Sequence, residues 1–415
     1  MDEYNGYNVM PQQPLPPQQP APKKKAPFWL GLLIGIIIGL VCLFICIMVF
    51  LTGSIGRRSQ NISRGGYYDK IDTLLSYLNS YYLWELDDDT IETALAKGLM
   101  DGIGDKYAEY YTPEEFEDLM EGMTGEYAGI GVSITMNDNN EVEVYKVFKG
   151  SPAEEAGIHP KDIIIEAAGI TDFTDLDAVV AEVRGEPGTT VDIKVRRDGE
   201  VISMTVERRQ ISMETVEYRI LDNHIGYIMI SEFDSVTVGQ FNQAIDDLTA
   251  QGMTSVIMDL RDNPGGSLDA VVVMCDRVLP AGVIVSTEDK QGGIQTENSD
   301  DANQLNIPIA LLINGNSASA SEVFVGAIQD YGMGVVVGEQ SFGKGIVQSI
   351  FQLSDGSGLK FTTENYYTPS GRSIQDVGIT PDIQVSIPDE AYDDGVVSEE
   401  EDTQLQAAIN ALLGK

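Results

Sequence analysis

The pattern of apolar residues begins with one long hydrophobic run. Residues 28–52 are 25 consecutive residues without a charge. About 20 apolar residues of helix cross the bilayer core, whereas the core of a signal peptide is only about 7–15 residues long. We therefore expect 28–52 to be a single retained transmembrane helix; a buried helix of a soluble core is the alternative. Residues 1–27 are rich in Pro and Gln, which predicts a disordered tail.

A helical region is predicted over residues 66–122. Its first helix is marked by apolar side chains with the i, i+3, i+4, i+7 spacing of one helix face, namely Ile71, Leu74, Leu75 and Leu78. Asp89 and Thr90 are expected to cap a second helix. A third helix is expected after Thr112, because Glu115 three residues later completes a capping box.

Short β-branched runs separated by Gly, Pro and Asp replace the helical spacing over residues 123–208. The runs are VEVYKVF, DIIIEAAG, TTVDIKVRRDG and VISMTVERR. Two helices are expected between them, one capped by Ser151 with Pro152 in its first turn and one ending at Gly185. Five or six short strands with two helices predict a compact α+β module.

Strands and helices alternate over residues 209–387, which predicts an α/β core with a largely parallel, buried sheet. Ligands of such sheets collect at the carboxyl ends of the strands. Three loops begin where strands are expected to end, with the sequences DLRDNPGG, INGNSASASE and GEQSFGKG. We therefore expect the three loops to converge on one edge of the sheet. Residues 388–415 are expected to form an acidic linker and a C-terminal helix.

Charge and cysteine content narrow the possible partners. The formal net charge is −39, from 65 acidic and 26 basic residues, so the folded part should repel nucleic acid. Cys42 and Cys46 lie in the apolar run and leave Cys275 alone, so neither a disulfide framework nor a cysteine-based zinc site is expected. No His, Asp and Glu cluster has metal-ligand spacing, and we predict no cofactor and no metal. Basic residues flank 28–52 on both sides, and counting them does not decide its orientation.

The candidate chemistry centres on Ser319 and Lys344. The chain has two histidines, neither in a recognisable catalytic setting, so a serine nucleophile would need another base. Lys344 lies between two glycines, and burial of its amine would lower the pKa from about 10.4 toward neutrality. Gln348 follows four residues later, one helical turn on, and can orient the amine without holding it charged. The alternatives are that Ser319 is only an N-cap and Lys344 only a solvated charge.

Backbone groups would complete such a site. The small neighbours of Ser319 leave space for a tetrahedral intermediate, and the N–H of Ala320 at a helix start would face developing negative charge. The loop DLRDNPGG at 259–266 is expected to supply a second donor, because Gly265 and Gly266 permit a backbone geometry that exposes an N–H. The β-rich module holds another candidate loop, formed by Ala128, Gly129, Ile130 and Gly131. Its N–H groups are expected to bind the C-terminal carboxylate of an extended peptide. An ordinary turn is the alternative for both loops.

Together these loops resemble the C-terminal processing (tail-specific) proteases, a family of serine peptidases that carry a PDZ domain. The resemblance covers about residues 66–413 and rests on YAGIGV, SPAEEAG, DLRDNPGG, NGNSASASEV, GEQSFGKGIVQ and YYTPSGRSIQDVGITPDI in the family's order. It implies that 123–208 is a PDZ domain and that 209–387 is a crotonase/ClpP-like α/β protease core. In this family's terms Ser319 would be the nucleophile, Lys344 the base and Gln348 its support. The oxyanion donors would be Gly265 and Ala320.

The resemblance also implies a location and partners. The N-terminus would be cytoplasmic and the catalytic domain extracytoplasmic, anchored to the cell membrane by 28–52. The PDZ domain would bind nonpolar C-terminal tails of proteins, which the Ser-Lys site would cleave through an acyl-enzyme. Helices toward both ends of the chain make a homodimer a further expectation.

Two positions depart from the family pattern, both in the PDZ region. Lys161 replaces the usual glycine before an aspartate, and AAGI at 167–170 replaces the usual Asn-Gly. Two other functions stay open. A PDZ adaptor built on an inactive protease core would be expected to lack Ser319 or Lys344. A crotonase-like acyl-CoA enzyme would share the alternating core but not the membrane anchor and the PDZ domain.

Overall fold

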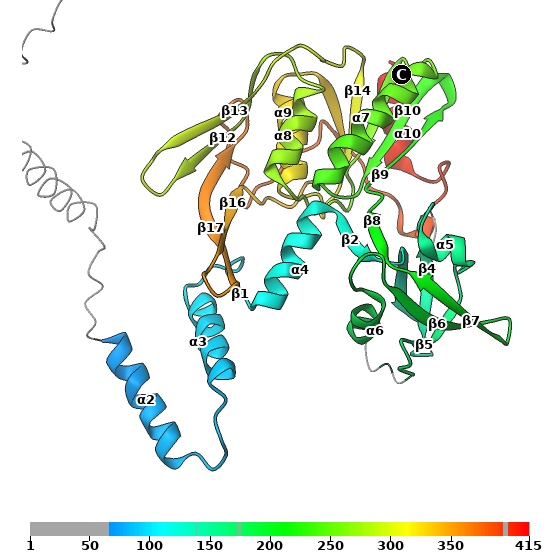
Figure 1. The fold of residues 1–415 in the computed structure, drawn as a ribbon. Helices are drawn as coiled ribbons and strands as arrows, with labels where there is room; N and C mark the ends of the chain where they lie inside the picture. Colours follow the sequence, from blue (N-terminus) through cyan, green and yellow to red (C-terminus); the bar gives the residue numbers. More distant parts are fainter. Residues whose placement is uncertain (1–65, 138, 172, 174–175, 393–396, 415) are drawn as a thin grey trace, which may run out of the picture. The chain divides into compact units, whose positions relative to one another are not determined.

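The computed structural model describes residues 66–137, 139–171, 173, 176–392 and 397–414 (Figure 1). The expected tail 1–27 and the expected membrane helix 28–52 lie outside these ranges. Among the helices that are described, none combines the length and the apolar character that a membrane crossing requires. The chain divides into two units, residues 1–87 and residues 88–415.

In the first unit, the described residues form the helix α2 (Tyr67–Tyr81), as the apolar spacing predicts. None of its residues is buried, and Leu74 and Leu78 on the predicted apolar face are 55% and 39% exposed. Amphipathic helices are stabilised mainly by burying such a face. The described part of this unit therefore leaves the apolar stripe of α2 uncovered.

The second unit begins with α3 (Asp88–Gly102), β1 (Glu109–Tyr111) and α4 (Pro113–Thr124). The start of α4 is as predicted: Glu115 N donates to Thr112 Oγ1 at 3.3 Å, and Thr112 N donates to Glu115 Oε2 at 2.8 Å. The predicted caps of α3 are wrong, because the helix begins before Asp89 and Thr90 and both lie in its first turn. Acidic side chains are favoured at the cap and in the first turn alike, so the pattern misplaced the boundary.

Five antiparallel strands form the sheet of the β-rich module, in the order β3-β4-β5-β6-β7. They are β3 (Val132–Met136), β4 (Val142–Val147), β5 (Ile163–Ala167), β6 (Thr190–Arg197) and β7 (Glu200–Glu207). Two helices complete the module, α5 (Pro152–Ala156) and α6 (Leu176–Val183), and Ser151 Oγ caps α5 as predicted. A separate antiparallel pair, β2 (Glu126–Gly129) and β8 (Arg209–Ser212), stands at the two ends of the module. The predicted α+β architecture is confirmed.

The two departures from the family pattern occupy backbone positions that disfavour them. Lys161 has a φ of 73° and Ala168 a φ of 51°, both in the left-handed region. Glycine and asparagine reach this region at little cost, whereas other L-residues lose roughly 1–2 kcal/mol there. Both side chains are exposed, so the cost lies in the backbone and not in the packing.

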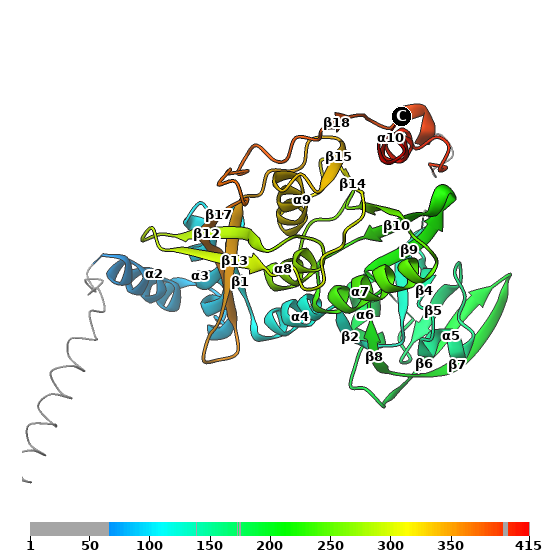
Figure 2. The same ribbon diagram turned by 90° about the horizontal axis from the view of Figure 1, so that it is seen from above.

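A six-stranded sheet forms the centre of the α/β core, in the order β18-β15-β14-β11-β10-β9 (Figure 2). Its strands are β9 (Val216–Leu221), β10 (Ile225–Ile230), β11 (Ser255–Asp259), β14 (Ile309–Ile313), β15 (Gly334–Gly338) and β18 (Ile383–Gln384). All neighbours are parallel except β9 and β10, so the predicted parallel sheet is confirmed. Every residue of β11 and β14 is buried, as expected for strands covered on both faces.

Helices cover both faces of this sheet. The long ones are α7 (Ser235–Ala250), α8 (Leu268–Asp276), α9 (Ala320–Asp330) and α10 (Thr403–Leu412), and two short 3-10 turns are η1 (Asp222–His224) and η2 (Asp389–Tyr392). The helices α7, α8 and α9 share a core with Ile228, whereas α10 packs in a second core with Tyr227. Since neighbouring residues of a strand point to opposite faces, α10 covers the face that the other three do not.

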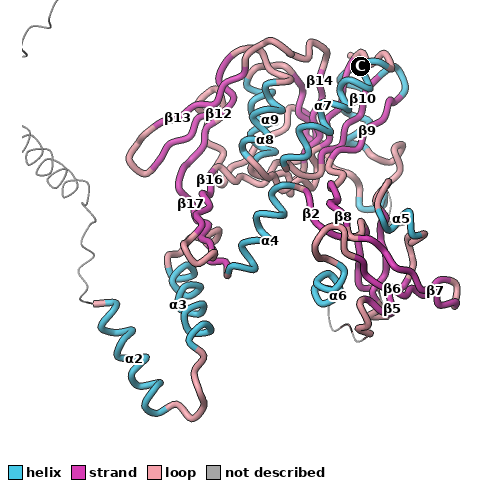
Figure 3. Tube along the Cα trace, in the orientation of Figure 1, coloured by secondary structure: helices cyan, strands magenta, loops and turns pink. Residues whose placement is uncertain are grey.

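The sequence pattern does not predict the second sheet of the core, an antiparallel one visible among the strands of Figure 3. It contains β1, β12 (Gly282–Asp289), β13 (Ile294–Ser299), β16 (Ile346–Gln352) and β17 (Gly358–Tyr367). Five of the six residues of β13 are exposed, so this strand carries no hydrophobic alternation to reveal it. One expectation is corrected here: Gln348 lies on strand β16 and not one helical turn beyond Lys344.

Candidate active site

The loops that follow β11, β14 and β15 meet at one edge of the central sheet, as predicted. Ala318 N donates to Asn263 O at 3.0 Å and joins the second loop to the first. Phe342 N donates to Ser317 O at 3.0 Å and joins the third loop to the second. Backbone pairing therefore holds the three candidate loops together at the carboxyl ends of their strands.

Ser319 is the one serine of the SASAS sequence that is partly exposed. Ser317 Oγ donates to Leu260 O at 2.7 Å, and Ser321 Oγ donates to Asn263 O at 3.0 Å. These two serines are 1% and 0% exposed, so their hydroxyls serve to fasten the loops. Of the three serines in SASAS, Ser319 is the one that borders a cavity.

The backbone of Ser319 is strained at the N-cap of α9. Its φ and ψ of 54° and −114° lie in a region that few residues other than glycine adopt. The carbonyl oxygen of Ser319 accepts the N–H of Glu322 at 2.9 Å and of Val323 at 3.0 Å. It also accepts the hydroxyl of Tyr366 at 3.1 Å. Strain that is held in place by several bonds is typical of sites that present a reactive group.

Glu322 joins the serine loop to the lysine loop through a carboxylate that is 1% exposed. Its Oε2 accepts the N–H of Ser319 at 2.9 Å and the N–H of Lys344 at 2.8 Å. Its Oε1 accepts the hydroxyl of Ser341 at 2.5 Å and the N–H of Gly343 at 2.8 Å. One side chain thus fixes the separation of the Ser319 and Lys344 backbones. This role of Glu322 was not predicted from the sequence, although the capping-box spacing from Ser319 to Glu322 could have indicated it.

Burial lowers the pKa of Lys344 from its ordinary value, and the positive charges of Lys360 and Lys106 lower it further. The carboxylates of Asp105 and Glu322 act in the opposite direction and do not reverse the shift. The shift favours the neutral amine, which is the form that can accept a proton. The environment of Lys344 therefore shifts its pKa in the direction that a general base requires.

The structure shows no hydrogen bond between the side chains of Lys344 and Gln348 among the described residues. Lys344 Nζ lies 4.6 Å from the centroid of the Tyr107 ring, a cation–π distance. The Nε2 of Gln348 is buried without a hydrogen-bond partner in the described chain. Gln348 borders the same cavity as Ser319. Support of the lysine by Gln348 stays a prediction.

The predicted oxyanion donors stand beside Ser319. A Cβ on Gly265, whose φ is 110°, would lie 2.9 Å from Ser319 Cβ and 3.0 Å from Ala320 N, so the close approach requires glycine. Gly265 N donates to Asn263 Oδ1 at 2.8 Å in this structure. The next residue, Gly266, borders the cavity together with Ser319 and Ala320. The loop therefore lies beside Ser319, but the N–H of Gly265 is occupied in this structure and Gly266 is the glycine that borders the cavity.

Comparison with known proteins places the core in a family. Residues 224–385, which contain all three loops, match the profile of Peptidase family S41. Over this segment the chain is similar to the S41 peptidases. Residues 128–207 match the profile of a PDZ domain, so the S41 domain follows a PDZ domain, as the sequence motifs predict.

Similar S41 proteins are known by sequence and by structure. The chain is 37% identical over 324 residues to the "Probable CtpA-like serine protease" of Staphylococcus aureus (strain COL), and 37% identical to a protein of the same name from Staphylococcus epidermidis. Each match covers 77% of this chain and 65% of the relative. A solved structure of the photosystem II D1 C-terminal processing protease is 27% identical over 78% of this chain and 89% of that chain, with a TM-score of 0.46.

The PDZ domain has an apolar groove of about 290 Å³ beside its edge strand β3. Gly129, Ile130 and Gly131 of the predicted carboxylate loop border it, together with Val180 and Val183 of α6. An unpaired strand edge, an apolar wall and a glycine-rich loop are the features by which PDZ domains bind a peptide as an added strand. Three of the four predicted loop residues are therefore placed on the groove.

Helix α4 contacts the carboxylate loop and corrects the expectation for its first residue. Ala128 N donates to Glu121 Oε1 at 3.0 Å, so this N–H is occupied in the structure. Arg184, which borders the groove and was not predicted, pairs with Glu121 at 3.1 Å and with Asp118 at 3.2 Å. Its guanidinium also lies 5.7 Å from the centroid of the Tyr127 ring. The groove is thus connected to α4 by ion pairs.

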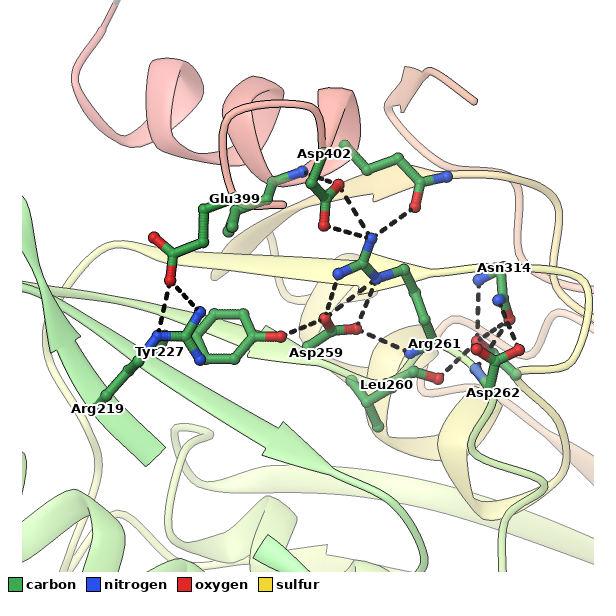
Figure 4. A network of polar contacts seen from close by, with 12 residues as sticks. Arg219, Tyr227, Asp259, Leu260, Arg261, Asp262, Asn314, Glu399 and Asp402 are labelled. Atoms are coloured by element: carbon green, nitrogen blue, oxygen red, sulfur yellow. Dashed lines mark hydrogen bonds and ion pairs between the residues drawn. The ribbon is translucent and has the colours of Figure 1, made fainter. Parts of the chain in front are cut away.

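A polar network ties the C-terminal segment to the base of the oxyanion loop (Figure 4). Arg261 pairs with Asp259 at 2.5 Å and with Asp402 at 2.9 Å. Arg261 Nη1 also donates to Gln404 Oε1 at 3.1 Å. Because Arg261 comes four residues before Gly265, the network fixes the start of the loop that carries this glycine. This role of Arg261 and Asp259 was not predicted from the sequence.

Proposed function

We propose that the chain is a serine endopeptidase with Ser319 as nucleophile and Lys344 as general base. The carrying observation is the shared carboxylate oxygen of Glu322, which binds the N–H of Ser319 at 2.9 Å and that of Lys344 at 2.8 Å. The partial exposure of Ser319 and the lowered pKa of Lys344 support the same assignment. Gln348 is proposed to orient the amine during the reaction.

The proposed reaction uses one lysine twice. Neutral Lys344 takes the hydroxyl proton of Ser319 as Oγ bonds to the scissile carbonyl carbon. The N–H of Ala320 and an N–H of the 265–266 loop stabilise the oxyanion. Protonated Lys344 then gives its proton to the leaving amine, the C–N bond breaks, and an acyl-enzyme remains. Lys344 then takes a proton from a water molecule that attacks the ester carbon; the C–Oγ bond breaks, the acid product leaves, and Lys344 returns the proton to Oγ, which regenerates Ser319.

We infer that the substrates are proteins with nonpolar C-terminal tails. The tail would add a strand beside β3, with its carboxylate at the 129–131 loop and its apolar side chains against Val180 and Val183. The groove supplies few polar groups beyond the backbone, so apolar side chains gain most from it. Processing or degradation of extracytoplasmic proteins follows as the proposed role.

Anchoring and assembly are part of the proposal. Residues 28–52 are proposed to hold the chain in the cell membrane, with the N-terminus in the cytoplasm and both domains outside. The uncharged run supports the anchor. A homodimer is proposed because the apolar stripe of α2 is uncovered in the described part of its unit.

Two other functions are less well supported. An adaptor with an inactive core would not need the backbones of Ser319 and Lys344 to be joined. In this chain the carboxylate of Glu322 joins them. A crotonase-like acyl-CoA enzyme is disfavoured by the S41 match over 224–385 and by the PDZ domain.

The test uses purified full-length chain and a protein substrate that ends in a nonpolar tail. Ser319→Ala and Lys344→Ala are each expected to lower kcat/KM by at least about 1,000-fold, as for residues that act as one unit. Lys290→Ala, at an exposed turn between β12 and β13, is the control and should retain activity. Cleavage that survives both active-site substitutions would contradict the mechanism.

A further inference from the structure

A cavity of about 220 Å³ opens beside Ser319. Its position next to this serine determines which part of a substrate can occupy it. Ala320 and Gly266 border it on the oxyanion side, and Gln348 and Tyr366 border it on the strand side. A substrate carbonyl within reach of Ser319 Oγ, with its oxygen at the N–H of Ala320, would lie at the border of this cavity. The cavity therefore offers a place for the side chain of the residue on the acyl side of the scissile bond, P1.

The lining of this cavity is apolar away from the catalytic groups. It includes Met123, Leu268, Val323 and Ile346. The one charged side chain among the described lining residues is Asp269, which is exposed. An apolar P1 side chain gains roughly 25 cal/mol per Å² that it buries, whereas a carboxylate loses its hydration and faces Asp269.

The size of the cavity sets an upper limit on the side chain. An apolar protein cavity of about 150 Å³ is known to hold benzene. The cavity beside Ser319, at about 220 Å³, has room for a leucine or phenylalanine side chain. Volume thus permits P1 residues well above alanine in size.

Met123 differs from Val323, another apolar lining residue, in the element it comes from and in its exposure. It belongs to the last turn of α4, outside both the PDZ match at 128–207 and the S41 match at 224–385. Its side chain is 38% exposed, whereas Val323 is buried in the core of the S41 domain. Methionine is unbranched and adapts its shape to its neighbours. It therefore forms the adjustable outer wall of the cavity.

We propose that this cavity is an apolar S1 subsite and that Met123 limits the size of the P1 side chain. The proposal rests on the proposed peptidase function and goes beyond it, because it assigns a bond preference to a helix outside the S41 domain. A larger space at position 123 admits larger P1 residues, and a smaller one excludes them.

The experiment uses the purified full-length chain and five peptides with one shared nonpolar C-terminal tail. The peptides differ only at P1, which is Ala, Val, Leu, Phe or Asp, and kcat/KM is measured for each. Met123→Ala widens the cavity and Met123→Trp narrows it. Met120→Ala is the matched control, because Met120 is 42% exposed on the same helix and does not border the cavity.

The unaltered chain is expected to prefer Leu and Phe over Asp by at least about tenfold. Met123→Ala is expected to raise the ratio of Phe to Ala cleavage about fivefold, and Met123→Trp to lower it about tenfold. Met120→Ala should leave the ratio unchanged. A purely structural role for Met123 would change all five peptides alike.

Three results overturn the assignment of S1 while the proposed function stands. They are a Phe to Ala ratio that both Met123 variants leave within twofold, an equal shift in Met120→Ala, and cleavage after Asp as efficient as after Leu. If the unaltered chain cleaves none of the five peptides, the proposed function fails and the S1 assignment fails with it.

Discussion

At the scale of single residues, the proposed mechanism depends on a lysine that must be neutral to accept a proton. Histidine would offer a neutral ring at physiological pH without help, whereas lysine needs its pKa lowered. Burial supplies the main part of this shift at Lys344, and two nearby lysines add to it. The positive charges of Lys106 and Lys360 are therefore part of the electrostatic environment of Lys344.

Removing one of these charges should move the pH profile in a defined direction. Lys106→Gln removes a repulsion, so the pKa of Lys344 should rise toward its ordinary value. A larger fraction of the amine is then protonated near neutral pH, and kcat/KM should fall there. The rise of kcat/KM with pH should shift to higher pH, measured with a peptide that carries a nonpolar tail.

Salt and a second lysine provide the controls for this shift. Added salt screens the Lys106 charge, so the difference between Lys106→Gln and the unaltered chain should shrink at high ionic strength. Lys290→Gln removes an exposed lysine from the β12–β13 turn and should leave the profile in place. A shift of the Lys106→Gln profile to lower pH would contradict the electrostatic explanation.

At the scale of elements, two turns of the PDZ domain hold Lys161 and Ala168 in left-handed backbone conformations that are unfavourable for these residues. Lys161 donates its N–H to Val144 O at 2.7 Å, and Ala168 donates its N–H to Asp192 O at 2.9 Å. These bonds fix the positive φ values of both residues. The strain is local, because both side chains are exposed.

Substitutions that relieve this strain should stabilise the domain. Lys161→Gly and Ala168→Asn are each expected to raise the free energy of unfolding by about 0.5–1 kcal/mol, part of the gain from Lys161→Gly being lost to a freer unfolded chain. Urea denaturation of the full-length chain measures the change. Asp198→Gly is the matched control, because aspartate already tolerates the left-handed region and should gain little. Destabilisation by both substitutions would show that the turns do not store strain.

The elements also show what a single sequence can and cannot predict. Repeated apolar spacing and capping residues predicted the helices and the parallel sheet, because these signals are local and regular. The hairpin β12–β13 was missed because β13 is polar and exposed. Ser319 and Lys344 were singled out as a candidate pair by the lack of a catalytic histidine setting and by the ordered family motifs around them, and the structure joins their backbones through Glu322. Glu322 and Met123 were not, because their roles depend on which loops and helices meet in space.

At the scale of the whole second unit, the C-terminal segment is fastened where the oxyanion loop begins. The side chains of Arg261 and Asp259 are only 15% and 4% exposed, and Asp402 closes the network from the start of α10. Arg219 makes a similar pair with Glu399 nearby, but both of these side chains are about half exposed, at 47% and 57%. Two arginines in one network thus differ mainly in burial.

The difference in burial predicts unequal effects. Arg261→Met leaves buried Asp259 without its cation and should lower the free energy of unfolding by about 3–5 kcal/mol. Arg219→Met removes an exposed pair and a contact 4.2 Å from the centroid of the Tyr227 ring, and should cost about 1 kcal/mol. Guanidinium denaturation of the two variants compares them directly. Equal losses would contradict a special role for the buried pair.

Helix α4 has a consequence for how such proteins can be recombined. Asp118 and Glu121 pair with Arg184 at the PDZ groove, and Met123, two residues after Glu121, borders the cavity beside Ser319. A chimaera joined between residues 122 and 123 takes the two ends of this helix from different parents. To transplant the proposed tail recognition together with the proposed P1 preference, the junction has to lie before Pro113, so that the whole helix stays with its PDZ domain.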